Sequence, residues 1–216
     1  MGEEKAVFRS VSMMILSLAL CSWDKAVAQR KPQLTVIVYN DAGVPERVVK
    51  QAMGIAERIY RKVGIEIACR EHDDSDAEGT AFFVRIVPNS FNLPREDFGV
   101  AFVGSDGLGV QADVFYSGIR QVAQSSSLDA AEILGHVIAH EVGHLLLGSN
   151  SHSALGIMQA HWAIGQLREV SMGTLGFDKQ QSENIRARLL GPYAAVRVTG
   201  KTAGISSLTK ASSPPM

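Results

Sequence analysis

The sequence predicts an α+β fold, in which a mixed N-terminal β-sheet is backed by two long helices and followed by a small, loop-rich part that ends in a helix. Three observations favour this class over a doubly wound one. The predicted elements run strand, helix, several strands and then a long helix, without regular alternation. The length of 216 residues, with 46% of them hydrophobic, suits one globular domain with its own core. The sequence shows no internal repeat of solenoid period.

The first two predicted elements are a strand and an amphipathic helix. Residues 33–40 are mostly β-branched or apolar and are followed by a turn at 41–43. Pro45 suits the first turn of a helix, and apolar residues recur at helical spacing over 48–63. Gly64 then ends this predicted helix.

Four short strands are predicted next. Each is a short run of apolar and β-branched residues, bounded by turn-forming residues or an acidic loop. They cover residues 65–69, 81–87, 100–103 and 110–116.

Two further helices are predicted in the second half of the chain. The first covers residues 128–147, where Asp129 can cap the N-terminus and Gly148 ends the helix. The second covers 179–190, with Asp178 as its cap. The segment between the two helices has little clear periodicity.

The N-terminal residues 1–28 have the pattern of a secretory signal sequence. An apolar run at 11–21 follows two basic residues, and the small residues within 26–28 suit a signal peptidase. We therefore expect a secreted or periplasmic protein. A short membrane anchor and a lipid attached at Cys21 are the alternatives.

The remainder of the chain divides into a domain at 29–191 and a tail at 192–216. The tail is rich in Ser, Thr, Gly and Pro, so we expect it to be disordered. If Cys21 leaves with the signal sequence, Cys69 is the only remaining cysteine, so the domain has no internal disulfide. We expect a monomer.

The charge and hydropathy patterns exclude two classes of partner. The chain has 21 basic and 22 acidic residues, a formal net charge of −1, which offers no basic field for nucleic acid. No apolar run reaches the roughly 20 residues that a membrane-spanning helix needs. We therefore expect no nucleic-acid partner and no stable membrane insertion after the signal is cleaved.

The predicted helix at 128–147 contains His140-Glu141-Val142-Gly143-His144, an H-E-x-x-H motif. Histidines four positions apart project from one face of a helix, so both imidazoles can reach one Zn²⁺ ion. Glu141 points toward the same site and can act as a general base toward water that the metal acidifies. Because the helix is apolar around much of its circumference, a cation would offset the cost of burying these polar groups.

A catalytic zinc ion needs a third protein ligand and one open coordination position. His152 is the nearest histidine, and a sharp turn at Gly148 would carry it back toward the metal. The alternative is a carboxylate from a later helix, as in the gluzincins, either Glu169 or Glu183.

With His152 and the segment Gly156-Ile157-Met158, the motif resembles that of the metzincin zinc peptidases, particularly their matrixin-like and archaeal branches. The third histidine stands two positions later than in the metzincin pattern. The resemblance implies that Met158 forms an apolar floor under the zinc ion. It also implies an N-terminal sheet, two long helices with the motif on the second, and a small C-terminal part.

The resemblance implies a secreted or periplasmic zinc-dependent endopeptidase domain at 29–191, with peptide or protein substrates. His140, His144 and His152 would hold Zn²⁺, and Glu141 would be the general base. The strand at 110–116 would be the edge strand that binds substrate. The alternatives are a non-catalytic, zinc-stabilised peptide-binding protein and a peptidase with a carboxylate as third ligand.

For four other features we expect a structural role, either packing or a solvent-exposed loop. We expect His136 to be a core or helix-surface histidine, and His161 and Trp162 to pack at the base of the C-terminal part, although all three could face a substrate cleft. The acidic segment 74–79 resembles half of a calcium loop, but Arg85 stands where such a loop needs Glu, so we expect a solvated loop.

Overall fold

The computed structural model describes residues 34–72, 81–89 and 98–191. The chain separates into two units at Lys31–Pro32, and every described residue belongs to the second unit. The expected signal sequence at 1–28, the acidic segment at 74–79 and the expected tail at 192–216 all lie outside the described residues.

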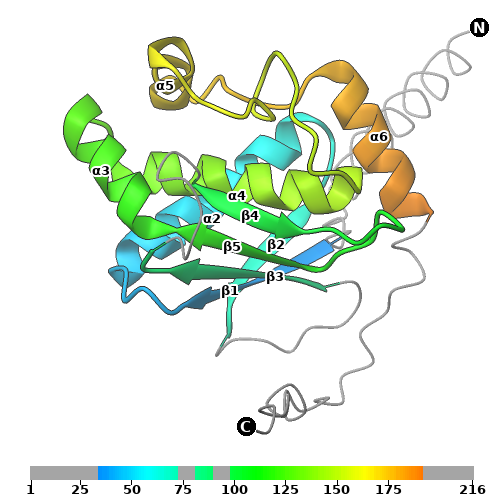
Figure 1. Cartoon of the computed structure of the whole chain (residues 1–216), viewed down its shortest axis with the longest axis horizontal. Coiled ribbons are helices and arrows are strands. Elements are labelled where there is room, and N and C mark those ends of the chain that lie inside the picture. The colour runs from blue at the N-terminus through cyan, green and yellow to red at the C-terminus, as the bar shows by residue number, and fades with distance from the viewer. Residues whose placement is uncertain (1–33, 73–80, 90–97, 192–216) are drawn as a thin grey trace, which may run out of the picture. The chain divides into compact units, whose positions relative to one another are not determined.

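A five-stranded mixed sheet forms the base of the domain (Figure 1). The strand order is β2-β1-β3-β5-β4; the first four of these are parallel and β4 is antiparallel to β5. This confirms the predicted mixed sheet. The bounds are β1 Leu34–Asn40, β2 Ile67–Glu71, β3 Ala81–Val87, β4 Gly99–Phe102 and β5 Gln111–Phe115.

One prediction about the sheet is wrong. The strand expected at 110–116 to be the edge is β5, which pairs with β3 on one side and with β4 on the other. Among the described strands, β4 is the edge on this side of the sheet, because the chain turns back after Phe102 and pairs Gly99 with Val114 and Phe102 with Gln111. The strand that comes earlier in the sequence therefore lies outside the later one.

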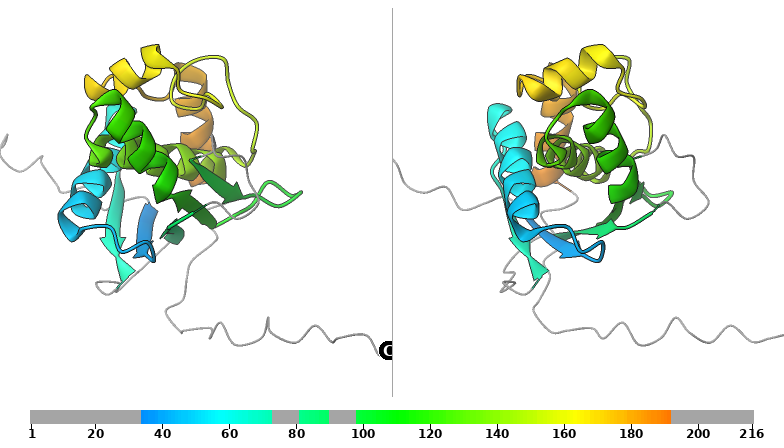
Figure 2. Two further views of the ribbon diagram at one scale, coloured as in Figure 1. Left: turned by 60° about the vertical axis from the view of Figure 1, so that its left-hand side comes forward. Right: turned by 90° about the vertical axis from the view of Figure 1, so that its left-hand side faces the viewer.

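Within residues 34–72, 81–89 and 98–191, five helices accompany the sheet. The two long helices, α2 and α4, lie side by side on one face of the sheet, as the two views of Figure 2 show. The helices α5 and α6 lie on the side of α4 away from the sheet (Figure 1). The bounds are α2 Glu46–Lys62, α3 Tyr116–Ser126, α4 Ala130–Leu147, α5 Ile164–Ser171 and α6 Lys179–Leu190.

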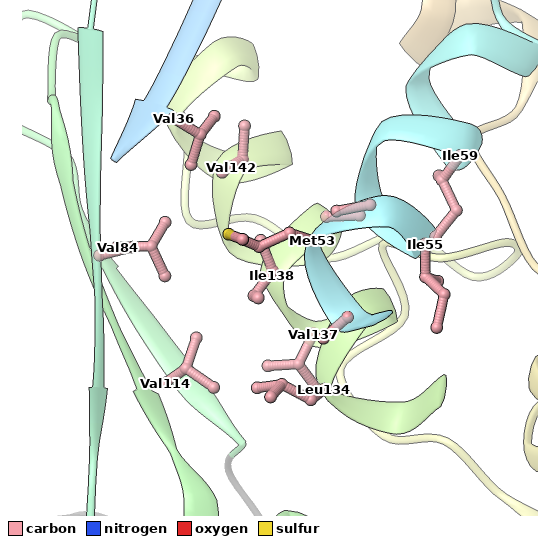
Figure 3. Close-up of a cluster of buried hydrophobic side chains, with 14 of the residues drawn as sticks. Val36, Met53, Ile55, Ile59, Val84, Val114, Leu134, Val137, Ile138 and Val142 are labelled. Atoms are coloured by element: carbon pink, nitrogen blue, oxygen red, sulfur yellow. The ribbon is translucent and has the colours of Figure 1, made fainter. Parts of the chain in front are cut away.

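The core fills the space between the sheet and the two long helices. Figure 3 shows Val36, Val84 and Val114 pointing from three strands toward Ile138 and Val142 of α4. On each strand, buried residues that face α4 alternate with residues that face away, as Leu34, Val36 and Val38 do on β1. On α4, Ile138 and Val142 are four positions apart and so lie on one face of the helix. The residues that carry the hydrophobic periodicity in the sequence are therefore the ones that hold α4 in place.

The ends of α4 and α6 are set by local hydrogen bonds that the sequence predicts. The Asp129 side chain accepts from the Ala131 N–H at 2.9 Å, and Asp178 accepts from the Gln181 N–H at 2.7 Å. Each cap satisfies a backbone donor that the first turn leaves without an intrahelical partner. The other end of α4 is Gly148, whose φ of 67° is the left-handed conformation that favours glycine.

Helix α4 is buried along almost its whole length, from Ala131 to Leu146. On its α2 side, the buried Tyr60 hydroxyl donates to the carbonyl oxygen of Ala139 at 2.9 Å. Because α4 is surrounded, its polar side chains face either protein or a pocket. Among the described helices, none combines the length and apolar character that a bilayer crossing requires.

Candidate metal centre

Three histidines converge where α4 ends. His140 and His144 lie one turn apart on α4, and His152 lies in the loop that follows. One ring nitrogen from each falls within 4.8 Å of the others, so the structure brings together the three residues predicted as metal ligands. The Nε2 atoms of His140 and His144 are 3.0 Å apart. His140 and His144 are buried, whereas His152 is exposed and is the member of the group that faces solvent.

The loop between Gly148 and His152 is folded by its own hydrogen bonds. The Gly148 N–H donates to the carbonyl oxygen of His144 at 2.9 Å, which closes the helix. The Ser151 N–H then donates to Ser149 Oγ at 3.0 Å, a short side-chain turn. These two turns return the chain toward α4. His152 therefore reaches the other two histidines although it stands two positions later than the third histidine of the metzincin pattern.

Backbone carbonyls fix which ring nitrogen carries the proton in the two helical histidines. His140 Nδ1 lies 2.7 Å from the carbonyl oxygen of Ile157, and His144 Nδ1 lies 2.8 Å from that of Ser149. Because a carbonyl oxygen can only accept, each Nδ1 donates. In the neutral ring, each Nε2 therefore keeps its lone pair.

Burial of both helical histidines lowers their pKa and favours the neutral ring. Burial lowers the pKa of His140 to about 3, with a further lowering from the neighbouring His144. Burial also lowers the pKa of His144 from its ordinary value. Two lone pairs thus face each other across the 3.0 Å between the Nε2 atoms, which is repulsive unless a cation binds both.

This donor set fits Zn²⁺. Imidazole nitrogen is a preferred zinc ligand, and the second ring nitrogen of a zinc-bound histidine usually donates to a carbonyl or carboxylate, as it does in His140 and His144. Two Zn–N bonds at a tetrahedral angle hold their nitrogens about 3.3 Å apart, close to the observed separation.

The carboxylate of Glu141 lies beside this group. Glu141 is 4% exposed and lines the same pocket as the three histidines. On its other side is the backbone of β4, where a Cβ added at Gly99 would lie 2.6 Å from Glu141 Oε1. Glycine at this position therefore allows the carboxylate to lie directly against the edge strand.

The pocket has a volume of about 200 Å³ and is formed by four segments of the chain. Its walls are α4, the start of β4, the loop that carries His152 and the segment after Met158. The lining residues are Phe98, Gly99, Val100, Ala101, Val137, His140, Glu141, His144, Asn150, His152, Gln159, Ala160 and Trp162.

Met158 is buried against α4. Its Sδ atom would lie 2.8 Å from a Cβ added at Gly143, the residue before His144. The preceding residue, Ile157, supplies the carbonyl oxygen that accepts from His140 Nδ1 and also from Trp162 Nε1 at 3.3 Å. The segment around Met158 thus forms an apolar base for the histidine pair and orients one of the two rings.

The remaining candidate residues have different surroundings. Glu169 lies on α5 and Glu183 on α6, and neither belongs to the group of ligand atoms. His161 is exposed and does not line the pocket. Trp162 packs against Phe98, as expected for a packing role, and also lines the pocket. His136 is buried.

Sequence reasoning missed the wall that β4 and the residue before it contribute, together with Asn150 and Gln159. The one local signal is Gly99, since glycine in a strand often marks a close approach of another group. The other residues have no sequence pattern that distinguishes them from ordinary surface positions.

Comparisons with known proteins bear on the fold. No protein-family model matches the sequence, and no curated protein matches it. Among solved structures, the archaemetzincin of Methanopyrus kandleri is similar with a TM-score of 0.50 and 14% identity, over 74% of this chain and 98% of that one. A zinc-dependent peptidase from Methanocorpusculum labreanum aligns over 71% of this chain and 99% of that one, with a TM-score of 0.47 and 12% identity. The likeness to archaemetzincin confirms the predicted α+β class, and the chain has an archaemetzincin-like fold.

Proposed function

We propose that the protein is a zinc-dependent endopeptidase. His140, His144 and His152 hold the metal, and Glu141 is the general base. The observation that carries this proposal is the shared pocket, in which the nitrogens of three histidines lie within 4.8 Å of one another and a buried carboxylate lies beside them. The likeness of the fold to archaemetzincin supports the same reaction class.

Bound zinc would polarise the peptide carbonyl and lower the pKa of water. The proton transfers are carried out by Glu141. Glu141 accepts a proton from water as the water oxygen attacks the carbonyl carbon. When the C–N bond breaks, the same carboxyl group returns that proton to the amine nitrogen, so one residue acts as base and then as acid.

The edge strand β4 supports binding of an extended peptide. Among the described strands, β4 pairs only with β5, so its outer side presents backbone N–H and C=O groups. Gly99, Val100 and Ala101 of this strand line the pocket. A peptide added as a further strand would therefore pass directly beside Glu141 and the histidines.

The N-terminal pattern supports export as part of this proposal. Cleavage after Ala28 would release a secreted or periplasmic enzyme that begins at Gln29. N-terminal sequencing and the mass of the exported chain test this directly. A chain that keeps residues 1–28 after export would instead indicate an anchored protein.

The test of the proposed activity is cleavage of a broad peptide library by the full chain loaded with zinc. We expect cleavage that a chelator abolishes and that added Zn²⁺ restores. Chelator-insensitive cleavage would contradict the proposal. Bound zinc with no cleavage of any peptide would contradict it too, and would identify a zinc-stabilised peptide-binding protein.

Replacing Gly99 with alanine should lower peptide hydrolysis and leave zinc bound. The added methyl group would lie 2.6 Å from Glu141 Oε1 and 2.8 Å from the backbone oxygen of Asp113, so the carboxylate has to move. We expect kcat/KM to fall about 10- to 100-fold, the range that a misplacement near 1 Å produces.

Gly165→Ala on α5 is the matched control, because a Cβ there meets no atom within 4 Å. This control should retain full activity. An unchanged kcat/KM in Gly99→Ala would mean that the position of Glu141 against β4 is unimportant for catalysis.

A further inference from the structure

His152 differs from the other two histidines of the metal centre in how its ring is held. The Nδ1 atoms of His140 and His144 each donate to a backbone carbonyl oxygen. Among the residues that the structure describes, none forms a hydrogen bond with the His152 ring, which packs against the other two imidazole rings. The position of His152 therefore depends on the backbone of the loop that carries it.

Helix α6 contacts this loop at both of its ends. The helix packs on α4, which carries the other two histidines (Figure 1). Gln181 and Arg188 are seven positions apart on α6, so their side chains leave the same face of the helix. Gln181 contacts the loop just after His152, and Arg188 contacts the turn just before it.

Gln181 links the loop to the first turn of α6. Its Nε2 donates to Oγ of Ser153, the residue after His152, at 3.1 Å. Its Oε1 accepts from the Asp178 N–H at 3.0 Å, which is one half of the capping box. The Ser153 N–H also donates to the carbonyl oxygen of Met158 at 2.8 Å. Because Gln181 is 8% exposed and both ends of its amide are bonded, it is a fixed anchor for the loop.

Arg188 lies against the turn between α4 and the loop. Its Nη2 donates to the carbonyl oxygen of Gly107, in the segment between β4 and β5. The guanidinium also packs against Gly148, where an added Cβ would overlap it. The left-handed conformation of Gly148 turns the chain toward His152. Arg188 therefore restricts the path by which the loop leaves α4.

We propose that Gln181 and Arg188 are positioning residues for the third zinc ligand. Helix α6 holds the two ends of the loop, and the His152 ring consequently stays beside His140 and His144. A ligand that is already near its bound position loses less conformational freedom when the metal binds, so zinc affinity rises. This inference rests on the proposed three-histidine metal site and is independent of whether the protein cleaves peptides.

The test measures the zinc affinity of the full chain by competition with a chromophoric chelator. In Gln181→Met, whose side chain has a similar length but makes neither hydrogen bond, we expect Kd to rise about tenfold, as for the loss of an outer-shell partner. Arg188→Met should raise Kd by a similar factor. In the His152→Ala background neither change should alter Kd, because α4 and two backbone carbonyls hold the remaining two ligands.

Two matched controls make the same chemical changes elsewhere in the chain. Gln166 accepts from the Ala163 N–H at 3.1 Å in the first turn of α5, as Gln181 does in α6. Arg186 lies on α6 and donates to the carbonyl oxygen of Val63. Gln166→Met and Arg186→Met should keep the wild-type Kd for zinc, even if they lower the melting temperature of the metal-free chain.

Ser153→Ala removes the hydrogen bond to Gln181 from the side of the loop and leaves the cap of α6 intact. It therefore tests the same contact if Gln181→Met does not fold. Its Kd should also rise, again only where His152 is present. In the chain with both changes the effects should not add, because the two substitutions remove one shared hydrogen bond.

The outcomes separate this inference from the proposed function. A rise in Kd that disappears in the His152→Ala background supports the positioning role, whether or not any peptide is cleaved. An unchanged Kd in both Gln181→Met and Ser153→Ala would overturn the role of Gln181, and an unchanged Kd in Arg188→Met would overturn that of Arg188. A rise of equal size without His152 would also overturn it, as a general structural effect. An unchanged Kd in His152→Ala itself would contradict the proposed metal site.

Discussion

Replacing Glu141 with glutamine is expected to reduce kcat/KM for peptide hydrolysis by about 10²- to 10⁴-fold, the usual contribution of a general base. Glutamine has nearly the same shape, so it keeps the packing against Gly99, but its amide does not take the proton from water. The three-histidine group does not include Glu141, so zinc should remain bound. Steady-state kinetics and elemental analysis on the same preparation measure both quantities.

Glu132→Gln is the matched control for this variant. It makes the same chemical change in the first turn of α4, outside the pocket, and keeps the backbone oxygen that accepts from His136. It should retain wild-type activity. The assignment of Glu141 as the base fails if Glu141→Gln hydrolyses peptides at a rate comparable to this control.

Replacing His152 with alanine is expected to weaken zinc binding by more than about 100-fold, since even the loss of an outer-shell partner costs 10- to 100-fold. Two imidazoles would remain, and the solvent-exposed side of the group would lose its protein ligand. Hydrolysis should fall in parallel and recover in part at high zinc concentration. Competition with a chromophoric chelator measures the affinity.

His161→Ala is the control, because His161 is an exposed histidine that lies outside the ligand group and the pocket. Its zinc affinity should equal that of the wild type. Equal affinity in His152→Ala would contradict the three-histidine site and would direct attention to Glu169 or Glu183 as a carboxylate ligand.

The elements that the sequence predicts well are those fixed by local signals. The helix at 130–147 combines continuous apolar character with Asp129 as cap and glycine at its end, and the helix at 179–190 has Asp178 in the same role. Both are found with their predicted C-terminal residues. In each case the hydrogen bond that starts the helix joins residues two or three positions apart, so sequence proximity alone identifies it.

The two helices that the sequence does not predict have neither an Asp cap nor a long apolar face. Helix α3 begins at Tyr116 directly after β5 ends at Phe115, with no glycine or proline between them, so the strand pattern runs into the helix. Helix α5 has eight residues and buries only Val170, which gives no visible periodicity. Helix α3 buries Ile119 and Ala123, whereas α5 is started by a hydrogen bond from the Ala163 N–H to Gln166 Oε1 at 3.1 Å, so neither helix shows a long apolar face in the sequence.

The convergence of the three histidines was predictable, while the pocket around them was not. His140 and His144 are brought together by helical spacing, and Gly148 indicates the turn that leads to His152. The wall at Gly99 depends on the strand order, which follows from β4 folding back outside β5. That pairing is set by contacts across the sheet, and the order of strands in the sequence suggested the wrong edge.

Zinc K-edge X-ray absorption of the full chain with one equivalent of Zn²⁺ reports the ligands of the metal site directly. We predict three imidazole nitrogens and one further light atom around the metal, with no sulfur, and two imidazoles in His152→Ala. A spectrum with fewer than three imidazoles in the wild type, or zinc that remains free in solution, would contradict the assignment of His140, His144 and His152 as the metal site.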